Sequence, residues 1–407
     1  MFYFKFIFHK KQAEMKELAI KERTFLVPRL FEELIRGSDS YAVYEGRDIL
    51  NFNKISKDIK KGKFIIIFNS DSKNIESAYN SVVRRIDELI TFEESEMIRS
   101  ERSPSERKRT AEKIRHNISN RLLLIVNNGN IVSFFEKQQL PHFIPFCGED
   151  PLNVKAGADF LVPYDFYKNL RDSLSESVFV EAIGMNITSG INVLLPRSQE
   201  TTELFRSAFE EIMPVTGKKI LDMGCGSGVL TILADKYFTN SEIFFSDILP
   251  EALASTIINI EKNLNSDFKF ENGKYQGKTM NNSLYCMRSG DLFENTDEFF
   301  DIIIFNPPWI DSVSRNRSEL ALNDKDQKTA ARFLMQAKRR LNNGGKIIMA
   351  YSDNSGYEAL EKFEKLIKDN NLNTSKEYSC KIQSRQSGRK WMKVLVKTME
   401  PVSVIQS

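Results

Sequence analysis

The sequence predicts an α/β protein whose C-terminal half is a doubly wound, mainly parallel sheet, preceded by an additional N-terminal α/β or α+β domain. From about residue 178 onward, short apolar runs typical of strands alternate with amphipathic runs typical of helices, and this alternation is characteristic of βαβ units. Four of these strands end in a glycine loop, an acidic residue or an Asn-Pro-Pro turn, as expected at the ligand-binding carboxyl edge of a parallel sheet. We therefore expect two domains, residues 1–175 and residues 176–400.

The size and charge of the chain agree with this organisation. Its 407 residues suffice for two or three domains, and a hydrophobic content of 41% is typical of globular proteins. The net charge of +3 excludes a histone-like polybasic chain. Residues 97–121, however, hold eight basic and three acidic residues, a local balance of +5. This segment forms either a solvated helix face or a surface that follows a phosphate backbone.

The cysteines and the apolar runs indicate the compartment. Cys147, Cys225, Cys286 and Cys380 are too widely spaced for a CxxC pair or a disulfide framework, which favours a reducing environment. No apolar run approaches the roughly 20 residues of a membrane span, and the aromatic N-terminus lacks a signal-peptide cleavage site. We expect a cytoplasmic protein with no membrane partner, and the oligomeric state is left open.

In the N-terminal half, five segments have recognisable periodicity or capping signals. In chain order, they predict a helix over 11–36, a buried strand within 61–72, an amphipathic helical stretch over 75–98, a capped helix from Ser103 to about Ser119, and a hairpin over 121–136 with its turn at Asn127–Asn130. No family is apparent in this half.

The elements of the C-terminal half follow in a regular order. We expect short strands at 178–184 and 191–196, a strand, glycine loop and helix over 218–238, a strand and helix over 241–263, strands within 282–293 and 298–309, a helix over 328–341, a strand near 344–353, and a closing antiparallel hairpin around Ser387-Gly388. Residues 310–328 form a long polar connection, and such a loop is often functional, for example as a substrate lid.

The loop after the first strand of this series, Asp222-Met223-Gly224-Cys225-Gly226-Ser227-Gly228, is typical of a cofactor loop. A dinucleotide fingerprint would need a glycine where Val229 stands, so nicotinamide or flavin binding is disfavoured. The neighbouring strand ends carry Asp247 and Asp291, whose negative charges would repel a pyrophosphate. They suit a cationic ligand that also carries a ribose diol and an adenine.

Through DMGCGSG, FFSD, RSGD and FNPPW in this order, residues 190–400 resemble the class I S-adenosylmethionine-dependent methyltransferases, whose catalytic domain is Rossmann-like and seven-stranded. The resemblance implies S-adenosylmethionine as cofactor. It also implies that the cofactor is bound by residues of the glycine loop and of the strand ends, namely Asp222, Gly224, Gly226, Gly228, Asp247, Ile248, Asp291, Leu292 and Asn306.

The same resemblance implies individual roles for these residues. The glycine loop would pass the methionine part of the cofactor, and Asp222 would help to hold its cationic amino group. Asp247 would bind the ribose hydroxyls and Asp291 would face the adenine amine, while Ile248 and Leu292 would sandwich the adenine ring.

Asn306-Pro307-Pro308-Trp309 is similar to the N-P-P-aromatic motif of methyltransferases that act on the amino or amide nitrogen of nucleic-acid bases or protein glutamine. The resemblance implies catalytic roles for Asn306, Pro307 and Trp309. The Asn306 side-chain oxygen and the Pro307 carbonyl can accept the two N–H bonds of a planar nitrogen and stabilise the positive charge that develops on it. Trp309 can stack on the substrate. Residues 193–205 resemble a stretch of the glutamine methyltransferases that modify release factors.

The histidines add an independent constraint. His9, His116 and His142 all precede residue 150, so residues 176–400 supply no histidine base, and no metal-ligand spacing is present. Both facts agree with catalysis by hydrogen-bond acceptance.

Three functions remain open. The leading hypothesis is N-methylation of a protein glutamine or an RNA base, with residues 1–175 as the substrate-recognition domain. A second is a small-molecule N-methyltransferase of specialised metabolism, and the third is a non-catalytic cofactor-binding module. Both macromolecules present an NH2 group on a flat conjugated system, so the site chemistry alone does not separate them.

Overall fold

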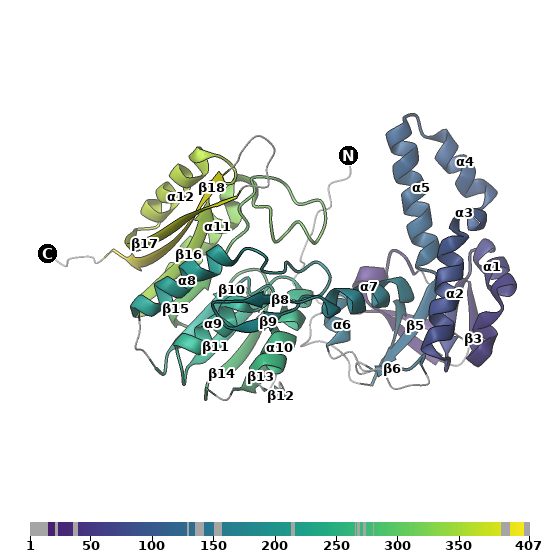
Figure 1. Cartoon of the computed structure of the whole chain (residues 1–407), viewed down its shortest axis with the longest axis horizontal. Helices are drawn as coiled ribbons and strands as arrows, with labels where there is room; N and C mark the ends of the chain where they lie inside the picture. The colour runs from purple at the N-terminus through teal and green to yellow at the C-terminus, as the bar shows by residue number, and fades with distance from the viewer. Residues whose placement is uncertain are drawn as a thin grey trace. The chain divides into compact units, whose positions relative to one another are not determined.

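A computed structural model describes residues 15–20, 23–35, 40–127, 130–134, 142–149, 157–212, 216–264, 266, 269–271, 274–279, 281–383 and 391–402. The chain divides into two compact units, an N-terminal unit that ends at Asp172 and a C-terminal unit that begins at Ser173. Each unit is described by itself (Figure 1).

The N-terminal unit is built on a mixed sheet with the order β1-β2-β7-β5-β4-β3, and β6 pairs with β5. Its strands are β1 Lys16–Ile20, β2 Arg23–Val27, β3 Tyr41–Glu45, β4 Phe64–Phe68, β5 Leu122–Asn127, β6 Asn130–Ile131 and β7 Asp159–Pro163. Its helices are α1 Phe52–Lys60, α2 Ser72–Arg84, α3 Ile86–Leu89, α4 Phe92–Ser100, α5 Pro104–Ser119, α6 Phe143–Phe146 and α7 Tyr164–Ser175, which continues across the unit boundary, and there are short 3-10 turns at Arg29–Phe31 and Gly46–Leu50. The central strands β4 and β5 are almost wholly buried apolar runs.

Several predictions for this unit are confirmed. β4 lies within 61–72, and α5 begins at a capping box in which the Ser103 hydroxyl accepts from the Glu106 N–H and the Glu106 carboxylate accepts from the Ser103 N–H. β5 and β6 form the predicted hairpin, with Asn127 paired to Asn130.

One prediction for this unit is wrong. The described part of 11–36 forms β1, β2 and a 3-10 turn instead of a helix, because Leu26 pairs with Phe160 of β7 and the sheet buries its side chain. The predicted helical stretch over 75–98 is confirmed, but it is divided among α2, α3 and α4, since α2 ends before Arg85 and a new capping box at Thr91 and Glu94 starts α4.

The C-terminal unit is built on a sheet with the order β12-β13-β14-β11-β10-β15-β16-β18-β17. The strands are β10 Lys219–Met223, β11 Glu242–Asp247, β12 Lys269–Glu271, β13 Lys274–Lys278, β14 Leu284–Ser289, β15 Phe300–Phe305, β16 Leu341–Ser352, β17 Leu372–Gln383 and β18 Trp391–Pro401. The five strands from β14 to β16 in this order are parallel, while β18 and β17 close the sheet antiparallel. This is the predicted doubly wound, seven-stranded Rossmann-like architecture, extended by the unpredicted hairpin β12–β13.

Helices pack against this sheet and complete its core. They are α8 Gln199–Ile212, α9 Val229–Tyr237, α10 Pro250–Leu264, α11 Lys328–Lys338 and α12 Tyr357–Asp369, with a 3-10 turn at Lys325–Gln327. Helix α11 and the hairpin β17–β18 confirm the sequence predictions. Of the two short strands expected before α8, only the first is found, as β8 Val178–Val180 paired with β9 Met185–Ile187; residues 191–196 form a turn and an irregular segment.

No helix among the described residues is long and apolar enough to span a membrane.

Candidate active site

The glycine loop leaves β10 at the carboxyl edge of the parallel strands and leads directly into α9. Gly224, Gly226 and Gly228 all have left-handed backbone angles, with φ of 64°, 57° and 83°. At Gly228 a Cβ atom would lie 2.9 Å from Thr256 Cγ2 and 3.1 Å from Thr256 Cα, so the loop requires glycine there for space as well as for conformation. The loop is thus pressed against α10.

Asp247 ends β11 beside this loop and holds it in place. Its carboxylate accepts hydrogen bonds from the Gly226 N–H at 3.0 Å and from the Leu249 N–H at 2.9 Å. Its side chain is buried, and burial raises the pKa of Asp247 to about 6 despite these two bonds. A carboxylate has about four lone-pair positions, so Asp247 retains acceptor capacity for ligand hydroxyls.

Asp222 lies in β10 just before the glycine loop and is almost completely buried. Its Oδ2 accepts from the Thr231 hydroxyl of α9 at 2.6 Å, but its Oδ1 has no hydrogen-bond partner among the described residues. Burial is the main cause that raises the pKa of Asp222 to about 7, and the nearby charge of Asp247 adds to it. A buried carboxylate oxygen without a donor is costly, and a cationic donor in the site would satisfy it.

Asp291 and Leu292, two of the residues expected near an adenine, follow β14 and already have partners within the protein, whereas Ile248 has open surface. Asp291 is partly exposed and forms an ion pair with the Arg332 guanidinium of α11 at 2.6 Å. Leu292 has a φ of 54° and lies in the core cluster that also contains Phe293. Ile248, after Asp247, is half-buried, so it has open surface to offer to a ligand.

Asn306-Pro307-Pro308-Trp309 follows β15, the strand paired directly with β10. Asn306 is exposed. Within the described part of the chain, no residue donates a hydrogen bond to the Asn306 side chain or to the Pro307 carbonyl. The exposed Asn306 side chain and the carbonyl of the buried Pro307 thus lack internal donors, as recognition of an external NH2 group requires.

The backbone after these acceptors is firmly held. The Trp309 and Ile310 N–H groups donate to the Leu322 carbonyl at 3.1 and 2.8 Å, and the Ser355 hydroxyl donates to the Trp309 carbonyl at 3.0 Å. The Trp309 ring packs against the hydrophobic core, and its buried Nε1 has no partner among the described residues. Trp309 thus fixes the motif through packing and leaves one polar atom for a ligand to satisfy.

Sequence reasoning missed the residues that anchor the polar loop 310–327. Arg317 of this loop makes two hydrogen bonds to Glu251, at 2.8 and 2.7 Å, and the Asn192 amide donates to the same carboxylate at 3.2 Å. Glu251 is completely buried near the start of α10, four residues after Asp247. No spacing rule links these three residues, because they lie in three segments that only the fold brings together.

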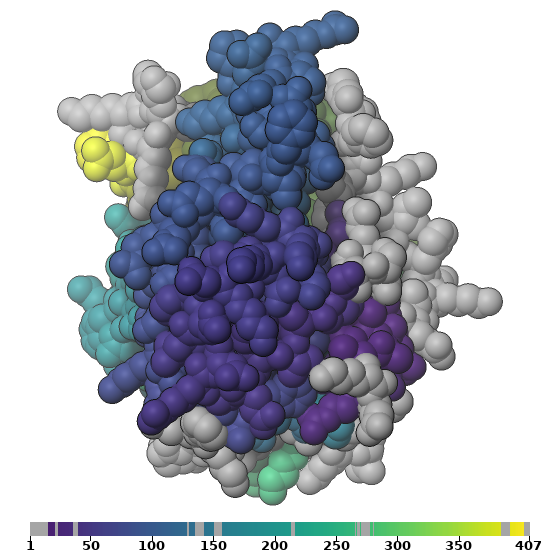
Figure 2. All heavy atoms as spheres, turned by 90° about the vertical axis from the view of Figure 1, so that its right-hand side faces the viewer, coloured from purple at the N-terminus to yellow at the C-terminus, as the bar shows by residue number. Residues whose placement is uncertain are grey.

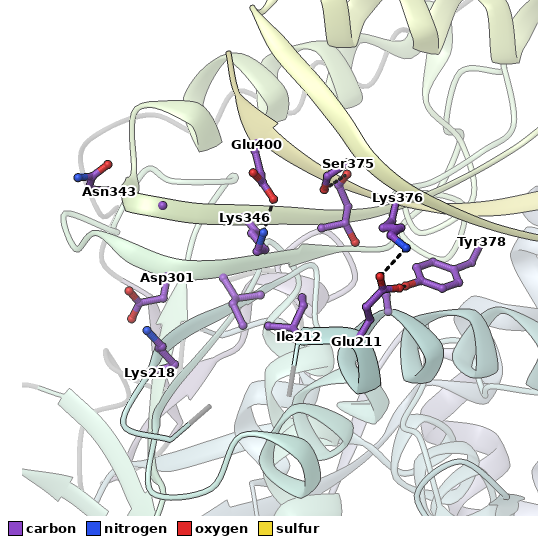
Figure 3. A pocket seen from close by; sticks show the side chains of 14 residues that line it. Glu211, Ile212, Lys218, Asp301, Asn343, Lys346, Ser375, Lys376, Tyr378 and Glu400 are labelled. Atoms are coloured by element: carbon purple, nitrogen blue, oxygen red, sulfur yellow. Dashed lines mark hydrogen bonds and ion pairs between the residues drawn. The ribbon is translucent and has the colours of Figure 1, made fainter. Parts of the chain in front are cut away.

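A pocket of about 440 Å³ lies at the other edge of the sheet (Figure 3). It is lined by residues at the amino ends of the parallel strands, among them Lys218, Asp301 and Lys346, together with ion pairs such as Lys376–Glu211. Because the predicted cofactor residues lie at the carboxyl ends of the same strands, this pocket is separate from the candidate active site.

Among the residues that the structure describes, no group of three or more His, Cys, Asp or Glu side chains is arranged to hold a metal ion.

Part of the C-terminal unit is similar to known proteins. Residues 197–379 match the family model "Methyltransferase small domain". Ribosomal RNA small subunit methyltransferase C of Actinobacillus pleuropneumoniae (serotype 5b) is 30% identical over 36% of this chain and 36% of its own length, and that of Haemophilus influenzae (strain 86-028NP) is 30% identical over 36% and 35%. The chain thus spans little more than a third of the length of these relatives.

One further relative and one solved structure are also similar to this chain. The release factor glutamine methyltransferase of Streptococcus pneumoniae is 28% identical over 48% of this chain and 66% of its own length. A methyltransferase structure from Pyrococcus furiosus is 19% identical with a TM-score of 0.34, over 57% of this chain and 94% of that chain.

Proposed function

We propose that the protein, whose residues 197–379 match the methyltransferase small domain family, is an S-adenosylmethionine-dependent enzyme that methylates a planar amide or exocyclic amine nitrogen of a macromolecule. The candidate substrates are an RNA base and a protein glutamine. One observation carries the proposal: Asn306 and Pro307 offer two acceptors without internal donors, next to the strand that leads into the glycine loop. The N-terminal unit is proposed to recognise the substrate.

The buried carboxylates support S-adenosylmethionine as the cofactor. The unpartnered Oδ1 of Asp222 fits a cationic amino group, and the remaining acceptor positions of Asp247 fit a ribose diol. Ile248 offers a half-buried apolar surface for an adenine ring. S-adenosylmethionine supplies an electrophilic methyl group on a sulfonium, from which a neutral thioether leaves readily.

The chain's own residues would then activate the accepting nitrogen. A planar NH2 group has a delocalised lone pair and is a poor nucleophile. When Asn306 Oδ1 and the Pro307 carbonyl accept its two N–H bonds, the lone pair is turned toward the methyl carbon and the developing positive charge is stabilised. The N–C bond forms as the C–S bond breaks, and the surplus proton on nitrogen leaves to water. No histidine base is needed for this step.

A small-molecule substrate is the less favoured alternative, because the relatives are named for action on ribosomal RNA and on release factors. Both kinds of substrate belong to the translation machinery, which supports a cytoplasmic location. A non-catalytic cofactor-binding module would not require acceptors kept free of internal donors.

The test is to incubate the protein with methyl-labelled S-adenosylmethionine and an extract of cells that lack it. Label that precipitates with macromolecules and is released by nuclease or by protease supports the proposal and identifies the substrate. Label found only in the low-mass filtrate overturns it, and so does the absence of any label when cofactor binding is demonstrated.

A further inference from the structure

Helices α4 and α5 form a hairpin that projects from the body of the N-terminal unit (Figure 1, Figure 2). Helix α4 has no buried residue, and the buried residues of α5, Ile114, Ile118 and Ser119, all lie in its C-terminal half. Only the base of the hairpin therefore packs against the unit. The tip, where residues 101–103 join the two helices, contributes nothing to the core.

The tip is nevertheless built to a defined shape. Capping boxes start both helices, and around Glu101 the Thr110 hydroxyl donates to the carboxylate and Arg107 Nε donates to the carbonyl, each at 2.9 Å. Near the base, Arg115 pairs with Asp87 at 2.8 Å. A tip of defined shape that adds no core burial is expected to have another purpose.

Positive charge gathers on the part of the hairpin around its tip, not on the hairpin as a whole. Residues 92–119 hold seven basic and six acidic residues, a net charge of +1, whereas residues 97–113 hold six basic and three acidic residues, a net charge of +3. Arg102, Arg109 and Lys113 are exposed, and no described acidic side chain lies within 4 Å of any of them. Glu93, Glu94 and Glu96 lie toward the start of α4, at the other end of the hairpin from Arg102, whereas Glu101 and Glu106 lie at the tip. The unpaired positive charge is therefore concentrated toward the tip.

We propose that this surface, the α4–α5 hairpin with Arg102, Arg109 and Lys113, binds the phosphate backbone of an RNA substrate. The inference rests on the proposed function and chooses between its two macromolecules. Guanidinium groups pair with phosphates in two-bond geometry, and contacts to successive phosphates release counterions. Arg109 and Lys113 are one helical turn apart, about 6 Å along the axis, so they present charge repeatedly along one face.

An acidic protein is the less suitable occupant. Protein interfaces depend on apolar or aromatic anchors at their centre. The two exposed large apolar side chains of the hairpin, Phe92 and Met97, lie on α4, whereas α5, which carries Arg109 and Lys113, exposes none. Its exposed side chains are basic, acidic or small and polar, apart from Pro104 at its start. This composition fits a polyanion that is held through its backbone.

The test compares two triple variants of the full chain that lose the same charge. One is Arg102→Ala, Arg109→Ala and Lys113→Ala in the hairpin. The control is Lys57→Ala, Lys60→Ala and Lys61→Ala on α1 of the same unit, where the lysines are also exposed. Binding to a fluorescently labelled single-stranded RNA of mixed sequence is measured between roughly 50 and 200 mM salt. Circular dichroism melting checks that both variants fold.

The hairpin variant is expected to bind about tenfold more weakly, with the slope of log affinity against log salt reduced by about 2, or about 0.7 for each lost single-strand phosphate contact. The control variant should stay within about twofold of the parent protein. Equal binding by the two variants, or no RNA binding by the parent protein, would overturn the inference. A third result would also overturn it: the hairpin variant loses methylation of an acidic protein substrate but binds RNA as the parent protein does.

Failure of this inference and failure of the proposed function are distinguishable. Binding of labelled S-adenosylmethionine and methyl transfer are measured on the same three proteins. If the protein methylates a protein substrate and the hairpin variant binds RNA normally, the proposed function holds and the RNA surface is rejected. Hairpin-dependent RNA binding without any methyl transfer leaves the surface standing without the enzyme.

Discussion

The Arg317 guanidinium donates two parallel hydrogen bonds to the Glu251 carboxylate, with Nε 2.8 Å from one oxygen and an Nη 2.7 Å from the other. The Glu251 side chain is only 1% exposed and that of Arg317 is 22% exposed. This ion pair ties the loop after the Asn-Pro-Pro-Trp motif to the start of α10, the helix that follows Asp247. It thereby couples the proposed acceptor site to the proposed ribose site.

Arg317→Ala should destabilise the protein by about 3 kcal/mol, because it leaves the Glu251 carboxylate buried without its cation. A matched control is Arg197→Ala, which breaks the Arg197–Glu176 pair, whose side chains are 59% and 65% exposed. That change should cost less than about 1 kcal/mol. Urea unfolding measures both. Equal losses in the two variants would mean that the buried pair is not the anchor of the loop.

This pair also shows how far the sequence could be read. That β14, β11, β10, β15 and β16 are parallel was predictable, because strands alternate with helices and four of these five strands end in a local signal that marks the carboxyl edge. Arg317 and Glu251 carry no such signal, since they are 66 residues apart in the chain. Their pairing depends on how a loop without regular structure crosses the sheet edge, and local periodicity does not contain that information.

In the N-terminal half, the sequence allowed more than one local structure. Residues 16–27 have apolar residues at spacings that suit a helix and also suit two strands, and sheet partners far along the chain decided the outcome. The cap at Ser103 was predictable because a capping box depends only on residues within one helical turn. Local chemistry was thus readable in both halves, whereas long-range pairing was not.

Gly228→Ala should weaken cofactor binding by at least about tenfold and lower stability by roughly 2–4 kcal/mol, because an added methyl group would meet Thr256 Cγ2 at 2.9 Å in a left-handed backbone. Gly217→Ala is the matched control. Its φ of 68° imposes a similar backbone strain, but nothing lies within 4 Å of the added methyl group. Binding of labelled S-adenosylmethionine and thermal unfolding are the measurements. If the two variants behave alike, close contact between the loop and α10 is not required.

Stability without cofactor should fall as the pH rises from about 4 to about 7. Burial raises the pKa of Asp222 to about 7 from a model-peptide value near 3.8, so in this range the folded protein holds a proton that the unfolded chain has released. The part due to Asp222 should be about 4 kcal/mol, because its pKa lies about three above its ordinary value, and it should level off above pH 7. Asp222→Asn should reduce this dependence in urea titrations and leave the part below about pH 6 that Asp247 contributes, since its pKa is raised to about 6. An unchanged slope in that variant would exclude Asp222 as a source.

Cofactor binding should have the opposite pH dependence. A cationic amino group favours the ionised Asp222, so affinity should fall toward tenfold per pH unit as the pH drops below about 7. Calorimetric titrations from about pH 5 to pH 8 measure this. A flat profile in the parent protein would show that the unpartnered Asp222 oxygen does not meet the cation of the cofactor.

Asn306→Ala should reduce methyl transfer by about 10²–10³-fold while cofactor affinity stays within about threefold, because the lost acceptor acts mainly on the reacting nitrogen. Asn343→Ala removes another exposed asparagine, at the amino-end pocket of the sheet, and should have no effect on transfer. Loss of cofactor binding in Asn306→Ala would instead assign this residue to the cofactor alone.

The central claim is that Asn306 and Pro307 direct the methyl group to a planar nitrogen of a macromolecule. The most direct measurement is to digest the labelled product to nucleosides and amino acids and to identify the methylated species by mass spectrometry. We expect an N-methylated base or N-methylglutamine, formed by the parent protein and not by Asn306→Ala. Methyl groups found on oxygen or carbon, or only on a small metabolite, would contradict it.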